Sequence, residues 1–254
     1  MDGLAPRFHL LAADAFGAGN TPAWAGTRPA NLQDEMALLE PVFTRAGKRF
    51  AMVAHSYGAA TALVTAVTQP HRVRALAVYE PVLFGLLDAH FPSPNEADGI
   101  RNALASAGAL LDAGNLRGAA ECFVDFWSGE GTWERMPESR KASVAVSARN
   151  IRNWTHGSFD DPTPLDAFSR LDIPVLYMVG KESPEAALGV ARLLTRVLPQ
   201  VEVVEFEGLG HMGPVTHPEI VNAVIARFLE KHFGGDLADG HAMEDEETSL
   251  AAFG

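Results

Sequence analysis

The sequence predicts an α/β fold in which a mostly parallel sheet is flanked by helices. Short apolar segments alternate with longer amphipathic ones, and several of the apolar segments are uninterrupted, as in strands buried on both faces. The chain has 254 residues, of which 47% are hydrophobic, and this is enough for one continuous core. We therefore expect a single domain that carries an insertion.

Strands and helices alternate in the first part of the chain. Residues 8–12 (FHLLA) predict a first strand, and a loop rich in glycine and proline leads to a helix over 32–46. The apolar run at 49–55 (RFAMVAH) predicts a strand buried on both faces. An alanine-rich helix over 58–68 and a further strand over 73–79 complete this part of the pattern.

The strand pattern then stops and resumes only near residue 172. Helix formers at helical spacing fill the interval, over 98–113, 116–127 and 137–153. After it we expect strands at 175–179 and 201–206 and helices at 184–197 and 218–233. The predicted organisation is a first core segment (1–83), a helical lid insertion (84–171), a second core segment (172–233) and a disordered acidic tail (234–254).

Composition excludes some partners. The formal net charge of −12 argues against nucleic acid or an anionic membrane surface, because binding either requires a basic patch. Cys122 is the single cysteine, which fits a reducing compartment. The N-terminus lacks a basic region followed by an apolar run, and no window is apolar enough to span a membrane. We expect a cytoplasmic protein with a small-molecule substrate, no nucleic acid or membrane partner, and an undetermined oligomeric state.

The segment 54–58 (AHSYG) carries the clearest chemical signal, because it joins a predicted buried strand to a predicted helix. A serine hydroxyl is a useful nucleophile when a base removes its proton and a tight strand-to-helix turn presents its oxygen. Such a turn crowds the positions two residues away, and Ala54 and Gly58 are both small. We predict Ser56 as a nucleophile and the Tyr57 backbone N–H as an oxyanion donor. The alternative is a serine that only caps the helix.

Over roughly residues 8–233 the sequence resembles the α/β-hydrolase superfamily. Residues 12–19 (AADAFGAG) are similar to its strand-end loop A-P-D-x-x-G-x-G, residues 54–58 to its nucleophile elbow, and residues 207–214 (EGLGHMGP) to its catalytic-histidine loop. The resemblance implies the α/β-hydrolase fold and a serine hydrolase of the carboxylesterase type. It also implies His211 as the base, since the family places serine before acid before histidine.

Two glutamates are candidates for the acid of the triad. The family's usual position follows the strand at 175–179 in a pattern like G-x-x-D, where this chain has Gly180-Lys181-Glu182-Ser183. Serine has no charge to hold an imidazolium, so Glu182 is one candidate. Certain haloalkane dehalogenases carry the acid after the strand that follows the elbow helix, and this chain resembles them in placing Glu80 there. A glutamate ending a buried strand is costly without a partner, so we favour Glu80 and keep Glu182 as the alternative.

The insertion is expected to cover a pocket. Its aromatic residues predict an apolar cleft, and a serine nucleophile predicts acyl transfer through an acyl-enzyme. The predicted substrate-pocket residues are His55, Phe126, Trp127, Trp154 and Met212, and the insertion also carries the aromatic residues Phe123 and Trp133. The remaining histidines show no metal-ligand spacing, so we assign no metal and no cofactor.

One element of the resembled fold has no counterpart in the pattern. A central strand ending in a His-Gly loop normally lies between the first strand seen here and the elbow strand, and that loop supplies the second oxyanion N–H. Too few residues precede Phe8 to form it, which leaves three alternatives: a misassigned gene start, a truncated protein, or another segment that fills the gap. Two alternatives to an esterase therefore stay open: a non-catalytic ligand-binding protein with the hydrolase fold, and an inactive truncated fragment.

Overall fold

The computed structural model describes residues 3–238 and 249–253. In this part of the chain a six-stranded sheet has the order β1-β6-β2-β3-β4-β5, and every neighbouring pair is parallel. The strands are β1 (His9–Ala13), β2 (Phe50–His55), β3 (Val73–Tyr79), β4 (Val175–Gly180), β5 (Val201–Phe206) and β6 (Ser249–Phe253). The α/β fold with a parallel sheet is confirmed.

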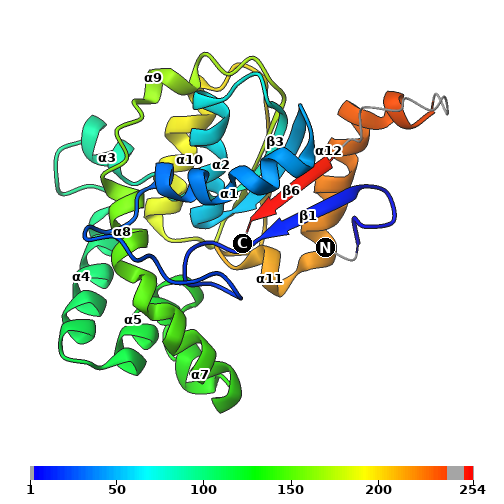
Figure 1. The fold of residues 1–254 in the computed structure, drawn as a ribbon. Helices are drawn as coiled ribbons and strands as arrows, with labels where there is room; N and C mark the ends of the chain where they lie inside the picture. Colours follow the sequence, from blue (N-terminus) through cyan, green and yellow to red (C-terminus); the bar gives the residue numbers. More distant parts are fainter. Residues whose placement is uncertain (1–2, 239–248, 254) are drawn as a thin grey trace.

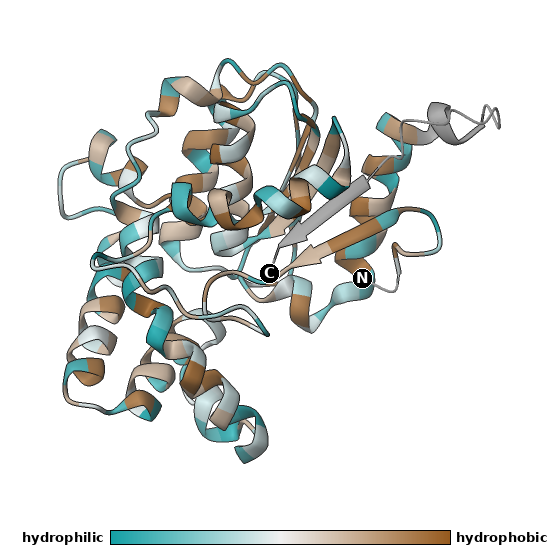
Figure 2. Cartoon of the chain, viewed as in Figure 1, coloured by the Kyte–Doolittle hydropathy of each residue, from teal (hydrophilic) through white to brown (hydrophobic). Residues whose placement is uncertain are grey.

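Helices cover both faces of the sheet (Figure 1). On one face lie α1 (Leu32–Ala46), α2 (Ser56–Thr68) and α10 (Glu185–Val197), and on the other lies α12 (Pro218–Ala238). Successive residues of β3 point to opposite faces of the sheet. Leu76 and Val78 belong to the core under α1, α2 and α10, whereas Ala75 and Ala77 pack with α12. This period of two, in a strand that is apolar from residue 75 to residue 79, explains the uninterrupted apolar run there, and β1 is drawn largely in brown in Figure 2.

Short helices form the insertion between β3 and β4. Figure 1 shows most of them as a separate group beyond the arrowheads of the strands, at the carboxyl edge of the sheet. Parallel α/β sheets bind their ligands at this edge. The helices are α3 (Gly85–His90), α4 (Asp98–Asp112), α5 (Leu116–Ser128), α6 (Thr132–Arg135), α7 (Glu138–Ser147), the 3₁₀ turn η1 (Ala148–Asn150), α8 (Ile151–Phe159) and α9 (Leu165–Phe168).

The prediction of a disordered tail from residue 234 is wrong for two segments. Helix α12 continues through Gly234-Gly235 to Ala238, because glycine costs a helix only about 1 kcal/mol and does not forbid it. Strand β6 lies between β1 and β2, where it pairs Leu250 with both Leu10 and Ala51. A C-terminal segment thus fills the gap that the sequence left in the sheet. The rest of the predicted tail, 239–248, lies outside the described residues.

Among the described residues, no helix is both long and apolar enough to cross a bilayer.

Candidate active site

Ser56 lies at a strained turn between β2 and α2. Its φ angle is +55°, and the flanking Ala54 and Gly58 leave room for the sharp bend. The N-cap of α2 is His55, which makes no side-chain capping hydrogen bond, so Ser56 does not serve as the cap. The Tyr57 N–H lies in the first turn of α2, where backbone N–H groups have no acceptor within the helix and the helix dipole favours negative charge.

A chain of hydrogen bonds connects Ser56 to a buried carboxylate. The His211 Nε2 atom lies 2.9 Å from Ser56 Oγ, and the His211 Nδ1 atom lies 2.7 Å from Glu80 Oε2. Glu80 is fully buried and His211 is 2% exposed. Because the carboxylate can only accept, Nδ1 carries the proton and Nε2 is free to accept from the serine hydroxyl. This is the tautomer that a general base requires.

Glu80 follows β3 directly and, like Ser56, has a positive φ, of +45°. Within the described residues, these two are the non-glycine residues with positive φ. Strained backbone of this kind persists where surrounding structure holds it, often at functional sites. The two ends of the hydrogen-bonded chain are thus the two strained positions.

Two donors from the end of β4 hold the second oxygen of Glu80. The Gly180 N–H donates over 2.7 Å and the Ser183 hydroxyl over 2.6 Å to Glu80 Oε1. Burial raises the pKa of Glu80, and these two hydrogen bonds oppose the rise by stabilising the charged form. Burial likewise lowers the pKa of His211, which keeps the imidazole neutral and able to accept a proton.

Two side chains at the strand ends hold consecutive carbonyls of the histidine loop. The Tyr79 hydroxyl donates to the Gly210 carbonyl over 2.8 Å, and His55 Nε2 lies 2.8 Å from the His211 carbonyl, to which it must donate. Burial lowers the pKa of His55 to about 3, so it stays neutral. Glycine at 213 permits this close approach, since a Cβ there would lie 2.4 Å from the Tyr79 hydroxyl. Tyr79 and His55 therefore position the loop that carries His211.

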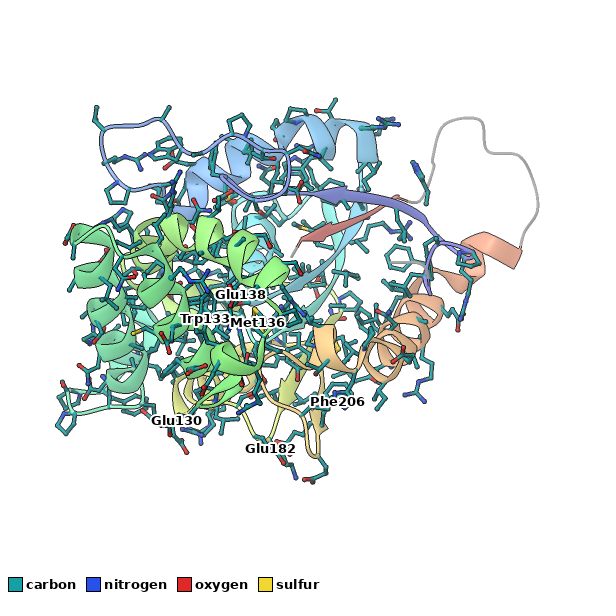
Figure 3. The ribbon with its side chains drawn as sticks, turned by 90° about the horizontal axis from the view of Figure 1, so that it is seen from below. Glu130, Trp133, Met136, Glu138, Glu182 and Phe206 are labelled. Atoms are coloured by element: carbon teal, nitrogen blue, oxygen red, sulfur yellow. The ribbon has the colours of Figure 1, made fainter. Side chains whose placement is uncertain are left out.

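A cavity of about 1130 Å³ opens between the sheet edge and the insertion, and Ser56 and His211 line it. Its remaining wall is largely apolar, and all five predicted pocket residues belong to it: His55, Phe126, Trp127, Trp154 and Met212. Trp127 stacks on the His211 ring with 3.9 Å between centroids. Phe123 also lines the cavity, whereas Trp133 is buried within the insertion instead. Figure 3 shows Trp133 and Met136 on the green insertion segment.

The alternative acid, Glu182, does not join this chain. Its side chain is exposed and makes no hydrogen bond to His211, and Figure 3 shows it near the margin of the molecule. Glu182 contributes its backbone instead, since its N–H donates to the Leu209 carbonyl. The structure therefore brings Ser56, His211 and Glu80 together and leaves Glu182 apart.

Sequence reasoning missed the supporting residues Gly180, Ser183 and Tyr79, as well as one buried carboxylate, that of Glu35. Ser183 stands where the resembled family usually has its acid, which was the available signal for a polar role there. No signal marked the other three. Among the described residues, no three His, Cys, Asp or Glu side chains are grouped so that they could hold a metal ion.

Comparison with known proteins gives the same fold. In the curated sequences, (E)-2-((N-methylformamido)methylene)succinate hydrolase of Acinetobacter baylyi is 23% identical over 229 residues, 88% of this chain and 81% of that protein. Among solved structures, 2-hydroxy-6-oxo-6-phenylhexa-2,4-dienoate hydrolase of Rhodococcus sp. strain RHA1 superposes with a TM-score of 0.68 at 20% identity, covering 92% of this chain and 83% of that one.

A hydrolase from Pseudomonas aeruginosa superposes with a TM-score of 0.67 at 17% identity, covering 89% of this chain and 91% of that one. At these identities the superpositions show the fold alone. The family model described as "Alpha/beta hydrolase family" matches residues 1–224. The chain is therefore a member of the alpha/beta hydrolase family.

Proposed function

We propose that this protein is a serine hydrolase that cleaves small, apolar carboxylic esters or related acyl compounds through a Ser56–His211–Glu80 triad and an acyl-enzyme. The observation that carries the proposal is the unbroken chain of hydrogen bonds from Ser56 Oγ through His211 to Glu80, in which Ser56 and His211 line the cavity. The predominantly apolar wall supports an apolar substrate.

In this mechanism Ser56 Oγ attacks the carbonyl carbon while His211 Nε2 takes the hydroxyl proton. The oxyanion that forms accepts a hydrogen bond from the Tyr57 N–H, and Glu80 stabilises the imidazolium. His211 then gives its proton to the leaving alkoxide as the carbon–oxygen bond breaks. Water, deprotonated by His211, attacks the acyl-enzyme, and the proton returns to Ser56 Oγ as the carboxylic acid leaves.

The insertion acts as the lid of this site. Trp127 on α5 stacks on His211 and is 8% exposed, so the insertion screens the imidazole from bulk water. Screening strengthens the hydrogen bonds within the site because the local dielectric is low.

The test is covalent labelling combined with turnover. A fluorophosphonate should label Ser56 in the wild-type protein and leave Ser56→Ala unlabelled, and short-chain aryl esters should be hydrolysed with the same dependence on Ser56. Absence of both labelling and hydrolysis from folded protein would reject the proposal and favour ligand binding without turnover. Labelling without ester hydrolysis would keep the nucleophile and move the substrate class to another acyl compound.

A further inference from the structure

Glu35 is a buried carboxylate that the proposed mechanism does not use. It lies in the first turn of α1, where the capping box between Asn31 and Asp34 fixes the start of the helix. Its neighbours on the inward side are Leu32, Met36 and Leu39, and Glu35 itself is only 3% exposed. The same cavity that contains Ser56 is lined by Glu35. A carboxylate therefore lies on the apolar face of an amphipathic helix and lines the substrate cavity.

The hydrogen bonding of Glu35 is incomplete. Within the described part of the chain, its carboxylate accepts one hydrogen bond, a long contact of 3.3 Å from the Phe16 N–H to Oε2, and no ion pair of residues 3–233 includes it. The adjacent Asp34 differs, because Arg28 holds both of its oxygens at 2.6 and 2.9 Å. An ionised carboxylate accepts through two oxygens, so Glu35 retains unused acceptor capacity toward the cavity.

Tyr57 supplies a second unmatched group nearby. Its hydroxyl is buried and has no hydrogen-bond partner among the described residues, and Tyr57 lines the same cavity. Burial raises the pKa of Tyr57, and the negative charge of Glu35 raises it further; both residues line the cavity. Buried polar groups without partners are rare and call for an explanation.

The side chains that line the cavity indicate the chemical class of the ligand. The cationic side chain among the cavity-lining residues is Arg140, which is exposed on α7 and makes no ion pair with Glu35. An ammonium group offers three donors and a positive charge and has no acceptor, so it matches a carboxylate that accepts one long hydrogen bond and a phenol oxygen without a partner among the described residues. A carboxylate-bearing ligand at this place would meet like charge.

We propose that Glu35 and Tyr57 form a subsite for an ammonium group within the otherwise apolar wall, so that the substrate cleaved at Ser56 is an acyl compound with an apolar body that carries one amine. This inference deepens the proposed function and rests on it for the cleavage step, whereas the binding step stands on the cavity alone. Because burial raises the pKa of Glu35 to about 7, a bound cation also stabilises the ionised form. Besides burial, the Phe16 N–H and Asp34 on α1 affect the pKa of Glu35. The pKa of Tyr57 is affected by Glu35, Asp34 and Asp161, which precedes α9.

The experiment measures binding of benzylammonium and of benzyl alcohol, a neutral probe of the same shape, by calorimetry on Ser56→Ala protein. We expect benzylammonium to bind more tightly by roughly ten-fold or more, as hydrogen bonds to charged groups are the strong ones. Glu35→Gln should abolish this preference. Glu40→Gln is the matched control, since Glu40 lies on the same helix in an exposed ion pair with Arg72 outside the cavity, and it should retain the preference.

Equal binding of the two probes, or an unchanged preference in Glu35→Gln, overturns the inference. If Glu35→Gln does not fold, two other measurements decide: Tyr57→Phe should weaken benzylammonium more than benzyl alcohol, and the preference of the unsubstituted subsite should grow as the pH rises from about 6 to about 8 while Glu35 ionises. A flat preference across that range, with no effect of Tyr57→Phe, contradicts it. Binding is measured on Ser56→Ala, which does not turn over. A failure of ester hydrolysis in the wild-type protein therefore does not affect the binding result, and a failure of selective benzylammonium binding does not affect the proposed hydrolysis.

Discussion

Ser183 donates a 2.6 Å hydrogen bond to Glu80 Oε1. In the resembled family the acid usually stands at about the position of Ser183, at the end of the strand that is β4 here. In this protein the carboxylate that is hydrogen-bonded to His211, and that we propose as the acid, follows β3 instead, and the serine at the family's usual acid position donates to it. The two neighbouring strand ends thus share the task of fixing one carboxylate against His211.

Removing the charge of Glu80 should nearly abolish turnover. Glu80→Gln keeps the shape but replaces an acceptor by an amide that cannot stabilise the imidazolium, and we expect kcat to fall by about 10³- to 10⁴-fold. Glu182→Gln should retain most of the activity, because its exposed side chain makes no hydrogen bond or ion pair with His211. Steady-state kinetics on an aryl ester, with circular dichroism to verify folding, compares the pair. The reverse ranking would assign the acid to Glu182.

Ser183 should act through Glu80. Ser183→Ala removes one of the two donors to Oε1, and we expect kcat to fall by about ten-fold with little change in KM, since a hydrogen bond to a charged group contributes about 1.5–3 kcal/mol. Ser183→Thr keeps a hydroxyl and should recover much of the loss. If Ala and Thr behave alike, the serine is a packing residue and does not position the acid.

Tyr79 should affect the histidine loop without touching the substrate. Tyr79→Phe removes the hydrogen bond to the Gly210 carbonyl, and we expect a stability loss of about 1 kcal/mol together with a larger proportional fall in kcat than in KM. Urea unfolding and steady-state kinetics give the two values. Tyr177→Phe is a matched control, because the Tyr177 hydroxyl is buried without a partner in the described part of the chain. If the two substitutions affect kcat equally, Tyr79 does not position the histidine loop.

Much of this arrangement follows from local sequence, and the rest does not. The elbow could be predicted because the small flanking residues, the strand and the helix all lie within a few residues of Ser56. Glu80 could be singled out because it is a charged residue at the end of an apolar strand. The Ser183–Glu80 contact joins residues 103 positions apart, so only the packing of β3 beside β4 reveals it. Glu35 follows Asp34, and the sequence alone does not distinguish it from a second solvent-exposed acid. Its burial results from the packing of α1 in the tertiary structure.

Strand β6 was missed for a different reason. The apolar residues 250–253 (LAAF) follow an acidic segment, and charge dominated the interpretation of that whole region as a tail. A short apolar run has no periodicity of its own that assigns it to a sheet. What places it is the vacancy between β1 and β2, which is a property of the tertiary structure.

Glu35 should make stability depend on pH in a direction opposite to that of a salt-bridged acid. Its pKa rises from 4.5 to about 7 on folding, so the folded state binds more protons than the unfolded state between these values and stability falls as the pH rises through them. Glu35→Gln should remove a penalty of up to about 3 kcal/mol at about pH 8 and flatten the dependence. Thermal unfolding of both proteins from about pH 5 to about pH 8 measures this. A wild-type protein that gains stability relative to Glu35→Gln as the pH rises would contradict the buried, unpaired state.

Strand β6 should be required for the stability of the sheet. It occupies an interior position, so its backbone groups pair with β1 on one side and β2 on the other, and a proline there removes a ladder hydrogen bond and is tolerated almost only at edges. Leu250→Pro should therefore lower the free energy of unfolding by about 3 kcal/mol or more, whereas Leu250→Ala keeps the N–H and should cost less. Because Phe253 pairs with Ala54, two residues before Ser56, the proline variant should also lose fluorophosphonate labelling at denaturant concentrations where the alanine variant keeps it. Coincident urea unfolding of the two variants would show that the sheet does not depend on this strand.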